Sequence, residues 1–352
     1  MTIPPPQQLS CHEFSRGKTA ALDRLVNHLP GFIVASAAME RIIEFLAATQ
    51  ASRATILITG ETGTGKELIA RAAHALSARC QQEFNAFNCT AVGHEMIESQ
   101  LFGHQRGSFT GAINDSKGII RATEGGTLLL DEIGELGSTA QPKLLRFLQS
   151  GEVHPVGALR PMKTNVRIIA ATNRNLEEEV AAGRFRADLF ERLNVMRLYV
   201  PPLRERREEI PMLIEHFLTE FQALEGRSGI RLSAAAMDLL IRHDWSRNVR
   251  ELHNEIHRVV LQAKNNEVVG IEKLFQSMRE TKKSDKQLPM DFADKILINA
   301  DLPYHQAVDE LQRVMIIRRL DQHGGNISRA ANELQMDRTG LMKAMSRLGI
   351  SH

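Results

Sequence analysis

The segment Thr59-Gly60-Glu61-Thr62-Gly63-Thr64-Gly65-Lys66-Glu67 decides the fold class of this chain. It follows an apolar run, Thr55–Thr59, and opens a stretch of helical spacing, Glu67–Ala78. The spacing G-x-x-x-x-G-K predicts a phosphate-binding loop between a buried strand and a helix, because glycines let backbone N–H groups turn toward phosphate oxygens. Residues 60–67 would bind a nucleotide, with Lys66 reaching its β- and γ-phosphates. Glu67 departs from the common pattern, in which a Ser or Thr hydroxyl contacts Mg²⁺.

Two further apolar runs extend this pattern into a sheet. Thr127–Asp131 and Val166–Thr172 are short and continuously apolar, which is typical of strands buried on both faces. Helical stretches such as Pro142–Gln149 lie between the strands. The alternation predicts an α/β fold, a parallel sheet with helices on both faces. After Pro211 the pattern becomes all helical, which predicts a small helical lid through about Phe275.

Acidic and amide side chains follow two of the predicted strands. Asp131 and Glu132 end the first of these runs, and Asn173 follows the second. In open α/β sheets, ligands bind at the carboxyl ends of the strands. We therefore expect Asp131 to hold Mg²⁺ through water and Glu132 to polarise an attacking water, while Asn173 orients that water or senses the γ-phosphate. Without the phosphate loop, a solvated acidic turn would be the favoured interpretation of Asp131-Glu132.

The composition is that of a globular protein with room for two or three domains. The chain has 352 residues, of which 43% are hydrophobic and 24% charged, so collagen, extended disorder and a coiled-coil rod are excluded. A net charge of +2 excludes a histone-like polycation but can conceal a basic tail. Three cysteines without a CxxC pair indicate a reducing, cytoplasmic location. We expect no membrane association, because no apolar run approaches the roughly 18 residues that span a bilayer.

At this point the chain resembles the AAA+ activators of sigma-54 RNA polymerase, the bacterial enhancer-binding proteins. The resemblance covers about residues 32–262, and a phosphate loop ending in Lys-Glu is that family's form. Its most specific part is Gly107-Ser108-Phe109-Thr110-Gly111-Ala112, which is similar to the family's GAFTGA surface loop with Ser108 in place of an alanine. The resemblance implies that this loop contacts sigma-54 and moves with the nucleotide state. An apolar ring at a loop tip suits such a transient contact, although Phe109 could instead pack into its own domain.

Four further site residues follow from the resemblance. Asn88 matches the asparagine that pairs with the catalytic glutamate and switches it between states. Arg186 and Arg192 match the arginine-finger helix that reaches the nucleotide of the neighbouring subunit. A surface salt bridge is the alternative for either arginine. Arg250 matches the sensor arginine of the lid, with Ser246-Arg247 in place of the family's Pro-Gly before it.

Residues 304–352 resemble a Fis-type helix-turn-helix domain. Residues 311–352 contain seven Lys/Arg against three Asp/Glu, and two short helices are predicted at Asn326–Leu334 and Arg338–Leu348. The second of these would enter the major groove of double-stranded DNA. A plain basic helical hairpin is the alternative. Four side chains would face the DNA, namely Arg338, Thr339, Lys343 and Arg347, and an apolar stripe on a preceding helix is formed by Tyr304, Val308, Leu311 and Met315.

Together these features predict an ATP-driven activator of transcription. It would bind upstream DNA, assemble as a ring that the resemblance makes a hexamer, and use ATP and Mg²⁺ to remodel the closed complex of the sigma-54 RNA polymerase holoenzyme. One alternative is a DNA-binding regulator of sigma-70 promoters with a vestigial ATPase core, which the preserved loop 107–112 disfavours. Another is a different AAA+ machine, such as a chelatase or unfoldase, which the DNA-binding tail disfavours.

The expected organisation has five parts. They are an N-terminal arm (1–31), an α/β part to about residue 204, a lid at about 205–275, a linker (277–303) and the DNA-binding domain (304–352). Many relatives carry a sensing domain of about 100 residues or more before the ATPase, whereas some 31 residues precede it here. We therefore expect control either by a separate inhibitory protein or by the abundance of the chain.

Overall fold

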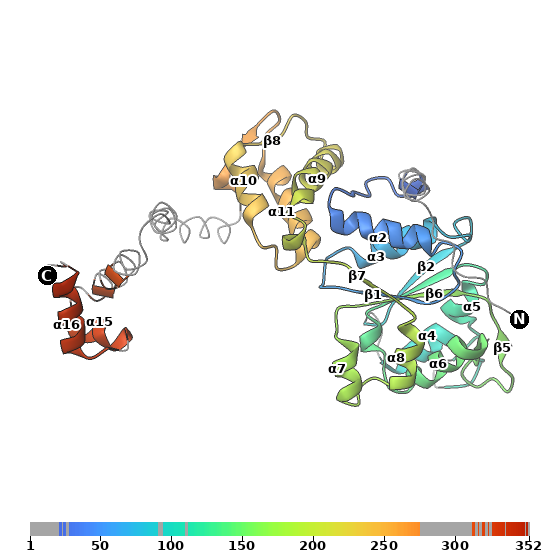
Figure 1. Cartoon of the computed structure of the whole chain (residues 1–352). Coiled ribbons are helices and arrows are strands. Elements are labelled where there is room, and N and C mark those ends of the chain that lie inside the picture. Colours follow the sequence, from blue (N-terminus) through green and yellow to red (C-terminus); the bar gives the residue numbers. More distant parts are fainter. Residues whose placement is uncertain are drawn as a thin grey trace, which may run out of the picture. The chain divides into compact units, whose positions relative to one another are not determined.

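The computed structural model describes residues 21–274, except 23, 26, 27, 91–93, 110 and 111, and parts of 312–350 (Figure 1). The predictions for residues 1–20, for the linker 277–303, for loop residues Thr110 and Gly111, and for the stripe Tyr304, Val308, Leu311 and Met315 lie outside the described residues. The chain divides into two compact units, Met1–Phe275 and Gln276–His352.

Among the described residues, five parallel strands form the central sheet of the first unit. They are β1 (Ile56–Thr59), β2 (Phe84–Asn88), β3 (Thr127–Asp131), β6 (Arg167–Thr172) and β7 (Met196–Tyr199), in the order β2-β3-β6-β1-β7. The three predicted strands are confirmed as the central strands β1, β3 and β6, whose apolar runs are almost wholly buried. The edge strands β2 and β7 were not predicted, because each carries polar and exposed residues that weaken the apolar signal.

Helices cover both faces of the sheet (Figure 1). The helices α2 (Ala37–Ala48) and α3 (Lys66–Ala75) pack on one face, where they form a core with Ile56 and Ile58 of β1. On the other face, where Leu57 points, lie α4 (His94–Phe102), α5 (Gly118–Ala122), α6 (Ala140–Ser150), α7 (Leu176–Ala181) and α8 (Ala187–Leu193). The described part of the N-terminal arm adds Ala21 and Leu25 to the first core. The predicted α/β layers are therefore confirmed.

A short hairpin stands beside the loop that contains residues 107–112. Its strands are β4 (Glu152–Val153) and β5 (Met162–Lys163), which pair in antiparallel fashion. His104 forms isolated bridges to Ser116 and to Val156 of this hairpin's turn. The hairpin therefore supports the stem of the loop from one side.

The lid contains α9 (Ile210–Leu224), α10 (Ala234–Arg242) and α11 (Asn248–Gln262), with 3-10 turns η2 (Leu203–Glu205) and η3 (Arg207–Glu209) before them and η4 (Ile271–Lys273) after them. The prediction of an all-helical lid was wrong in one detail, because β8 (Arg231–Leu232) and β9 (Val268–Val269) form a short parallel pair. Strands of two residues are too short to produce a periodic pattern. Trp245 anchors the α10–α11 turn, since its ring is fully buried and its Nε1 donates to Leu240 O at 2.9 Å.

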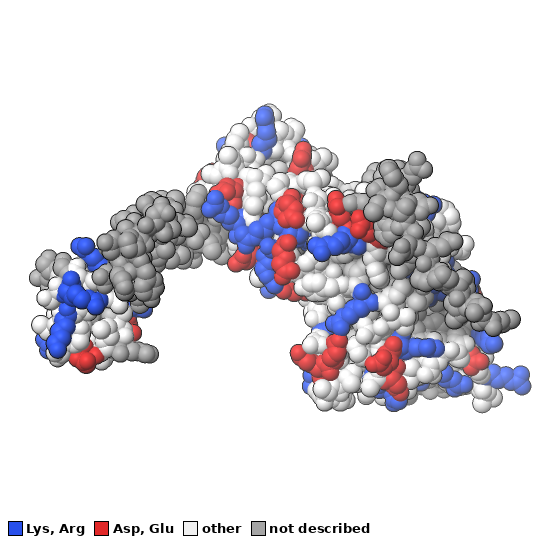
Figure 2. Space-filling view, in the orientation of Figure 1, with Lys and Arg blue, Asp and Glu red and all other residues white. Residues whose placement is uncertain are grey.

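The second unit contains the two predicted helices, α15 (Ile327–Glu333) and α16 (Arg338–Arg347). Asn326 and Asp337 cap them, because their side chains accept hydrogen bonds from Arg329 N at 3.2 Å and Gly340 N at 2.7 Å. A small core of Ile316, Leu320, Ala330, Ala331, Leu341 and Met345 joins the helices. On the visible face of this unit, Lys and Arg outweigh Asp and Glu (Figure 2). No helix in the described parts of either unit is long and apolar enough to cross a membrane.

Candidate nucleotide site and contact surfaces

The phosphate loop lies between β1 and α3, at the carboxyl edge of the sheet. Gly63 and Gly65 have φ angles of 80° and 97°, which side-chain-bearing residues rarely adopt. Lys66 is buried, and its Nζ donates to Gly60 O at 3.0 Å and to Glu61 O at 3.2 Å. Burial lowers the pKa of Lys66, and this effect is opposed by Glu132 and Asp131. The loop thus gathers a helix N-terminus and an ammonium group where phosphates would bind.

Two carboxylates stand beside this ammonium group at the end of β3. Glu132 Oε1 lies 4.0 Å from Lys66 Nζ, and Glu132 has a left-handed backbone with φ of 52°. That conformation is uncommon for a residue other than glycine and occurs often at functional sites. Burial raises the pKa of Asp131, which accepts a hydrogen bond from Glu132 N at 3.1 Å. The end of β3 therefore places two carboxylates against the phosphate loop.

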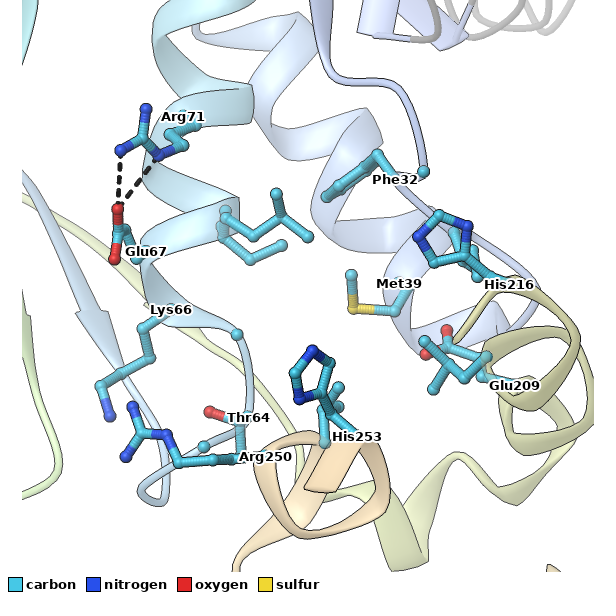
Figure 3. Close-up of a pocket in the computed structure, with 18 of the residues that line it drawn as sticks. Phe32, Met39, Thr64, Lys66, Glu67, Arg71, Glu209, His216, Arg250 and His253 are labelled. Carbon is cyan, nitrogen blue, oxygen red and sulfur yellow. Dashed lines mark hydrogen bonds and ion pairs between the residues drawn. The ribbon is translucent and has the colours of Figure 1, made fainter. Parts of the chain in front are cut away.

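Asp131 fits a Mg²⁺ site of the kind that uses a nucleotide. Mg²⁺ prefers oxygen ligands and is often held by one or two carboxylates, waters and substrate phosphates. In the described residues, no group of three or more His, Cys, Asp and Glu side chains could hold a metal ion. Glu67 is not placed to be a Mg²⁺ ligand, because its carboxylate pairs with Arg71 at 2.8 Å (Figure 3). The phosphates and water would thus have to supply the other ligands.

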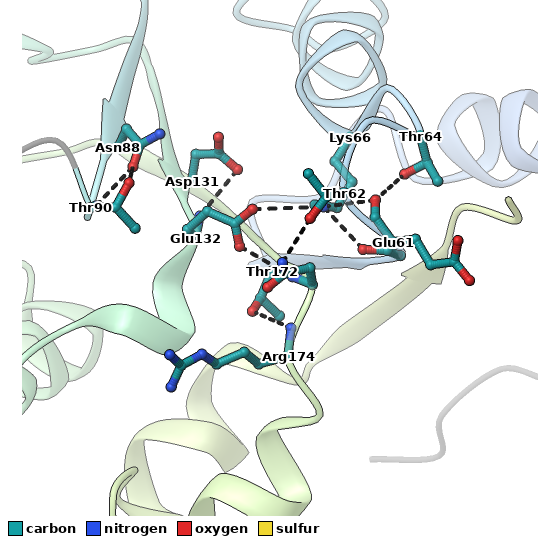
Figure 4. Close-up of polar contacts among 12 residues, drawn as sticks. Glu61, Thr62, Thr64, Lys66, Asn88, Thr90, Asp131, Glu132, Thr172 and Arg174 are labelled. Carbon is teal, nitrogen blue, oxygen red and sulfur yellow. Dashed lines mark hydrogen bonds and ion pairs between the residues drawn. The ribbon is translucent and has the colours of Figure 1, made fainter. Parts of the chain in front are cut away.

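Asn173 joins the phosphate loop to the acidic strand end. Its Nδ2 donates to Thr62 Oγ1 at 2.8 Å, and its backbone N donates to Glu132 Oε2 at 3.2 Å (Figure 4). The fold therefore brings the predicted residues Lys66, Asp131, Glu132 and Asn173 together from three separate strand ends. Asn173 lies where it could bond a phosphate oxygen or a water.

Asn88 ends β2 directly beside Asp131, its partner in the sheet register. Its Oδ1 accepts hydrogen bonds from Thr90 N at 2.8 Å and Thr90 Oγ1 at 2.7 Å. Glu132 N donates a hydrogen bond to Asp131, and the Glu132 carboxylate accepts one from Asn173 N. Neither of these bonds involves Asn88. The structure thus places Asn88 next to the acidic strand end. Its side-chain oxygen accepts hydrogen bonds from Thr90, and its side chain is not bonded to Glu132.

A cavity of about 640 Å³ opens from the phosphate loop toward the lid, within the size range of small-molecule sites. At its polar end, the side chains of Lys66 and Arg250 lie close together (Figure 3). Its other end is lined by Phe32, Met39 and His216, and His253 lies between the two ends (Figure 3). A triphosphate and a planar base could therefore lie along one cavity. Arg250, which the family resemblance suggested as a lid residue near the nucleotide, lies on the cavity wall.

A buried ion pair that the sequence did not reveal braces this cavity. Arg206 and Glu209 pair at 3.0 Å, and each is almost completely buried. Arg206 Nη2 donates to Thr64 O of the phosphate loop at 2.7 Å, and Ser36 Oγ donates to Glu209 Oε1 at 2.6 Å. Three distant segments thus meet on one buried pair. The only signal in the sequence was an arginine-rich turn after two prolines, which names no partner.

Arg186 and Arg192 lie at the two ends of α8, away from the cavity formed by their own chain. Both are exposed, and Arg186 forms a two-point ion pair with Asp188, at 3.0 Å and 2.7 Å. Arg186 thus forms the surface salt bridge that was the alternative to an arginine finger. Within the described residues, no ion pair involves Arg192. Neither arginine lines the described cavity, so a role in ATP hydrolysis would require a second subunit.

The loop at residues 107–112 closes on its own stem. Gly107 N donates to Ala112 O at 2.8 Å, and Gln105 N donates to Val156 O of the hairpin turn at 2.9 Å. Phe109 is partly buried, and its ring packs edge-on against His104 with centroids 5.0 Å apart. The described loop residues are therefore outside the two apolar cores of the α/β part, although only Gly107 is exposed and Ala112 is buried. Ser108 Oγ is buried without a hydrogen-bond partner among the described residues.

The predicted DNA-facing residues lie at the surface of α16. Arg338, Thr339, Lys343 and Arg347 are all exposed, whereas Leu341 and Met345 are buried. Spacings of four residues place Thr339, Lys343 and Arg347 on a common helical face, while Arg338 begins the helix on a different side. The second unit thus presents a capped helix with three cations toward solvent.

Comparison with known proteins gives three consecutive matches. Residues 32–199 match the sigma-54 interaction domain, residues 204–290 the AAA+ ATPase lid domain, and residues 307–348 the Fis family of bacterial regulatory proteins. The transcriptional regulatory protein ZraR of Escherichia coli K12 is 40% identical over 317 residues, which are 90% of this chain and 68% of ZraR. The chain belongs to the sigma-54-dependent transcriptional activators.

Other relatives of this activator are longer than the matched region. XylR of Pseudomonas putida is 40% identical over 319 residues, and the match spans 89% of this chain but 56% of XylR. The nitric oxide reductase transcription regulator NorR of Vibrio vulnificus is 41% identical, with 62% of its length matched. Among solved structures, NtrX of Brucella abortus in complex with ATP is 31% identical, with a TM-score of 0.65 over 94% of this chain and 73% of NtrX. The family and the AAA+ fold with a Fis-type helix-turn-helix are thus as predicted.

Proposed function

We propose that this activator hydrolyses ATP at sites shared between adjacent subunits of a ring and uses the energy to remodel the sigma-54 RNA polymerase closed complex. The observation that carries the proposal is the convergence of Lys66, Asp131, Glu132 and Asn173 at one end of the sheet. Glu132 and Asn173 come from different strand ends, yet Asn173 N bonds the Glu132 carboxylate at 3.2 Å. Such a group can bind a triphosphate and activate a water beside it.

Each residue would have a defined chemical role. Backbone N–H groups of the loop and Lys66 would bind the phosphates, and Arg250 would add a second positive charge from the lid. Glu132 would accept a hydrogen bond from the attacking water, whose nucleophilic oxygen then approaches the γ-phosphorus in line with the leaving group. Mg²⁺ near Asp131 would neutralise charge on the β- and γ-phosphate oxygens when bound. That NtrX was solved with ATP supports nucleotide binding at this site.

The position of the arginines supports the proposed ring. Phosphoryl transfer gains from an arginine that contacts the γ-phosphate, and in the described part of this chain Arg186 and Arg192 lie apart from their own cavity. We therefore assign them to the site of the neighbouring subunit, in a ring taken to be a hexamer. To make that contact, Arg186 would exchange its partner Asp188 for the phosphate. Solvent screens an exposed surface ion pair so strongly that it contributes little to stability, and this exchange is therefore inexpensive.

The two remaining surfaces would connect the ring to its partners. Residues 107–112 would contact sigma-54, because the loop lies outside the apolar cores and belongs to the matched sigma-54 interaction domain. The exposed cations of α16 would contact upstream double-stranded DNA, as the match to the Fis family supports. These partners place the activator in the cytoplasm, where RNA polymerase works. Control by a separate inhibitory protein remains a prediction.

Paired variants test the proposed ATPase. Lys66→Ala should lose ATP binding, while Glu132→Gln should bind ATP but hydrolyse it at least about 100-fold more slowly, since a positioned base contributes roughly 10²–10⁴-fold. Arg192→Ala subunits mixed with Glu132→Gln subunits should regain part of the hydrolysis rate, because an active site can then receive Glu132 from one subunit and Arg192 from the other. Undiminished hydrolysis by Lys66→Ala would refute the assigned site. Absence of any regain in the mixture would refute the shared one.

A further inference from the structure

One carboxylate connects the phosphate loop to the lid. Glu61 lies in the loop, and its two oxygens accept hydrogen bonds from both terminal nitrogens of Arg204, at 2.6 Å and 2.8 Å. Glu61 Oε2 also accepts a hydrogen bond from Asn248 Nδ2 at 3.1 Å. Arg204 belongs to η2, which leads from the sheet into the lid, and Asn248 begins α11. Three segments far apart in the chain therefore meet on Glu61.

Asn248 is built into this junction through both ends of its amide. Besides Glu61, its Nδ2 bonds Thr62 O at 3.1 Å, and its Oδ1 accepts a hydrogen bond from Leu203 N at 2.7 Å. The side chain is fully buried, and the backbone has a left-handed φ of 57°. Asparagine tolerates that conformation better than most residues. A strained, buried and completely bonded asparagine indicates a position with a specific geometric task.

The phosphate loop and the lid are also in direct contact. A Cβ atom on Gly63 would lie 2.2 Å from the carbonyl oxygen of Arg247, the residue before Asn248. The loop and the start of α11 therefore touch without an intervening side chain. Glu61, Arg204 and Asn248 are arranged around this contact, and we call these three residues the lid latch.

The latch lies close to a residue that faces the nucleotide cavity. Arg250 is two residues beyond Asn248 on α11 and lines the cavity beside Lys66 (Figure 3). Its charge also influences the pKa values of both Lys66 and Asp131. Because Asn248 and Arg250 belong to the same turn of α11, the position of Asn248 determines how far the Arg250 side chain can reach. A lid that moved away from the loop would carry Arg250 out of reach of the phosphates.

We propose that Glu61, Arg204 and Asn248 are positioning residues for ATP binding, which hold the lid against the phosphate loop so that Arg250 reaches the nucleotide. This inference rests on the proposed function, because it gives Arg250 a phosphate to bind. The latch would act by raising the fraction of chains whose lid is in place, since apparent affinity falls in proportion to that fraction. Glu61 is 40% exposed, so solvent screening limits the effect to roughly 3–10-fold.

The test measures ATP affinity of the full-length chain by equilibrium titration, with hydrolysis kinetics alongside. Glu61→Gln places an amide NH₂ opposite the donor groups of Arg204 and Asn248. Arg204→Gln removes the guanidinium that forms the two-point pair with Glu61. Each should raise the Kd for ATP about 3–10-fold. Arg204→Gln, which lies outside the phosphate loop, should leave kcat at saturating ATP within about two-fold, because bound ATP itself holds the lid. Glu177→Gln is the matched control, since Glu177 forms an exposed ion pair with Arg197 at 2.5 Å and has no assigned role. It should leave the Kd unchanged.

The decisive comparison repeats Glu61→Gln in an Arg250→Ala background. If the latch works through Arg250, it has no side chain to position in the Arg250→Ala background. The double variant should then bind ATP as weakly as Arg250→Ala alone. Additive losses would overturn the proposal, because they would indicate a direct effect on the phosphate loop. Wild-type affinity in both Glu61→Gln and Arg204→Gln would also overturn it. Binding is measured independently of turnover, so a chain that binds ATP without hydrolysing it would refute the proposed ATPase and leave this test intact.

Discussion

Thr90 holds the carbonyl end of the Asn88 amide through two hydrogen bonds, from its backbone N at 2.8 Å and its hydroxyl at 2.7 Å. An ionised carboxylate accepts hydrogen bonds but cannot donate them. With Oδ1 engaged by Thr90, the other end of the amide, Nδ2, is directed toward the strand that carries Asp131 and Glu132 (Figure 4). This orientation leaves the donor end of Asn88 available to the carboxylate that would activate water.

We predict that Asn88→Ala lowers kcat for ATP hydrolysis by roughly 10-fold or more, because an unpositioned general base loses part of its contribution. The Kd for ATP should stay within about two-fold, since Asn88 does not line the described cavity. Thr90→Val should lower kcat less than Asn88→Ala does, because the hydrogen bond from the backbone N of residue 90 remains. Thr90→Ser keeps the hydroxyl and should therefore keep kcat near the wild-type value. Single-turnover hydrolysis and nucleotide titration separate the two effects. A changed Kd with an unchanged kcat would contradict the assigned role.

The buried hydroxyl of Ser108 leads to a prediction about stability. Its Oγ has no hydrogen-bond partner in the part of the chain that the structure describes, and such a group costs about 1–3 kcal/mol relative to a bonded one. Ser108→Ala should therefore raise the free energy of unfolding by about 1 kcal/mol and raise Tm by a few degrees. Denaturant titration of the full chain measures this. A less stable variant would show that Ser108 has a partner in solution.

Gly157 limits the same loop from the hairpin side. A Cβ atom there would lie 2.7 Å from Ser108 Cβ, and the φ of Gly157 is 80°. Gly157→Ala should shift loop 107–112 and reduce sigma-54 binding, with ATP hydrolysis unaffected. Gly183→Ala is a suitable control, because Gly183 has a similar φ of 71° with nothing within 4 Å of the added atom. Equal sigma-54 binding by both variants would contradict the coupling of hairpin and loop.

Burial raises the pKa of Cys89 to about 12, and Asp131 and Glu132 nearby add to this effect. Thiol reagents attack the thiolate, so Cys89 should not react at pH 8 in the folded chain and should react after unfolding. Because the folded-state pKa exceeds the ordinary value, protonated Cys89 favours folding, and this contribution is lost as pH rises from about 8.5 toward 12. A chain with Cys11→Ser and Cys80→Ser isolates the signal in a thiol-labelling assay. Rapid labelling at pH 8 in native buffer would contradict the burial.

The sequence was sufficient where function or burial imposes a local pattern. The phosphate loop and the apolar strands β1, β3 and β6 could be predicted because their residues are consecutive. The helices α15 and α16 could be predicted in the same way, because each is preceded by a residue type that favours the start of a helix. Asn88, Arg186, Arg192 and Arg250 were placed only by family resemblance.

Contacts between distant residues could not be predicted. Arg204 is 143 residues from Glu61, and Asn248 is 187 residues from it. Nothing in the neighbourhood of any of these residues specifies its partner, and the pairing depends on how the lid folds back over the sheet. The bonding of Asn88 to Thr90 was missed for a different reason. The two residues are neighbours, but an amide followed by a hydroxyl is common in turns and specifies no geometry.

The central claim is that ATP hydrolysis drives the loop at residues 107–112 against sigma-54, and promoter opening measures it directly. Purified full-length chain, ATP, Mg²⁺ and sigma-54 holoenzyme are combined on a promoter that carries the upstream DNA site, and open complexes are detected by the reactivity of unpaired thymines. The account predicts opening by the wild type with ATP, none with a non-hydrolysable analogue, and none by Phe109→Ala even though that variant still hydrolyses ATP. Opening by Phe109→Ala at the wild-type level, or no opening by the wild type, would contradict it.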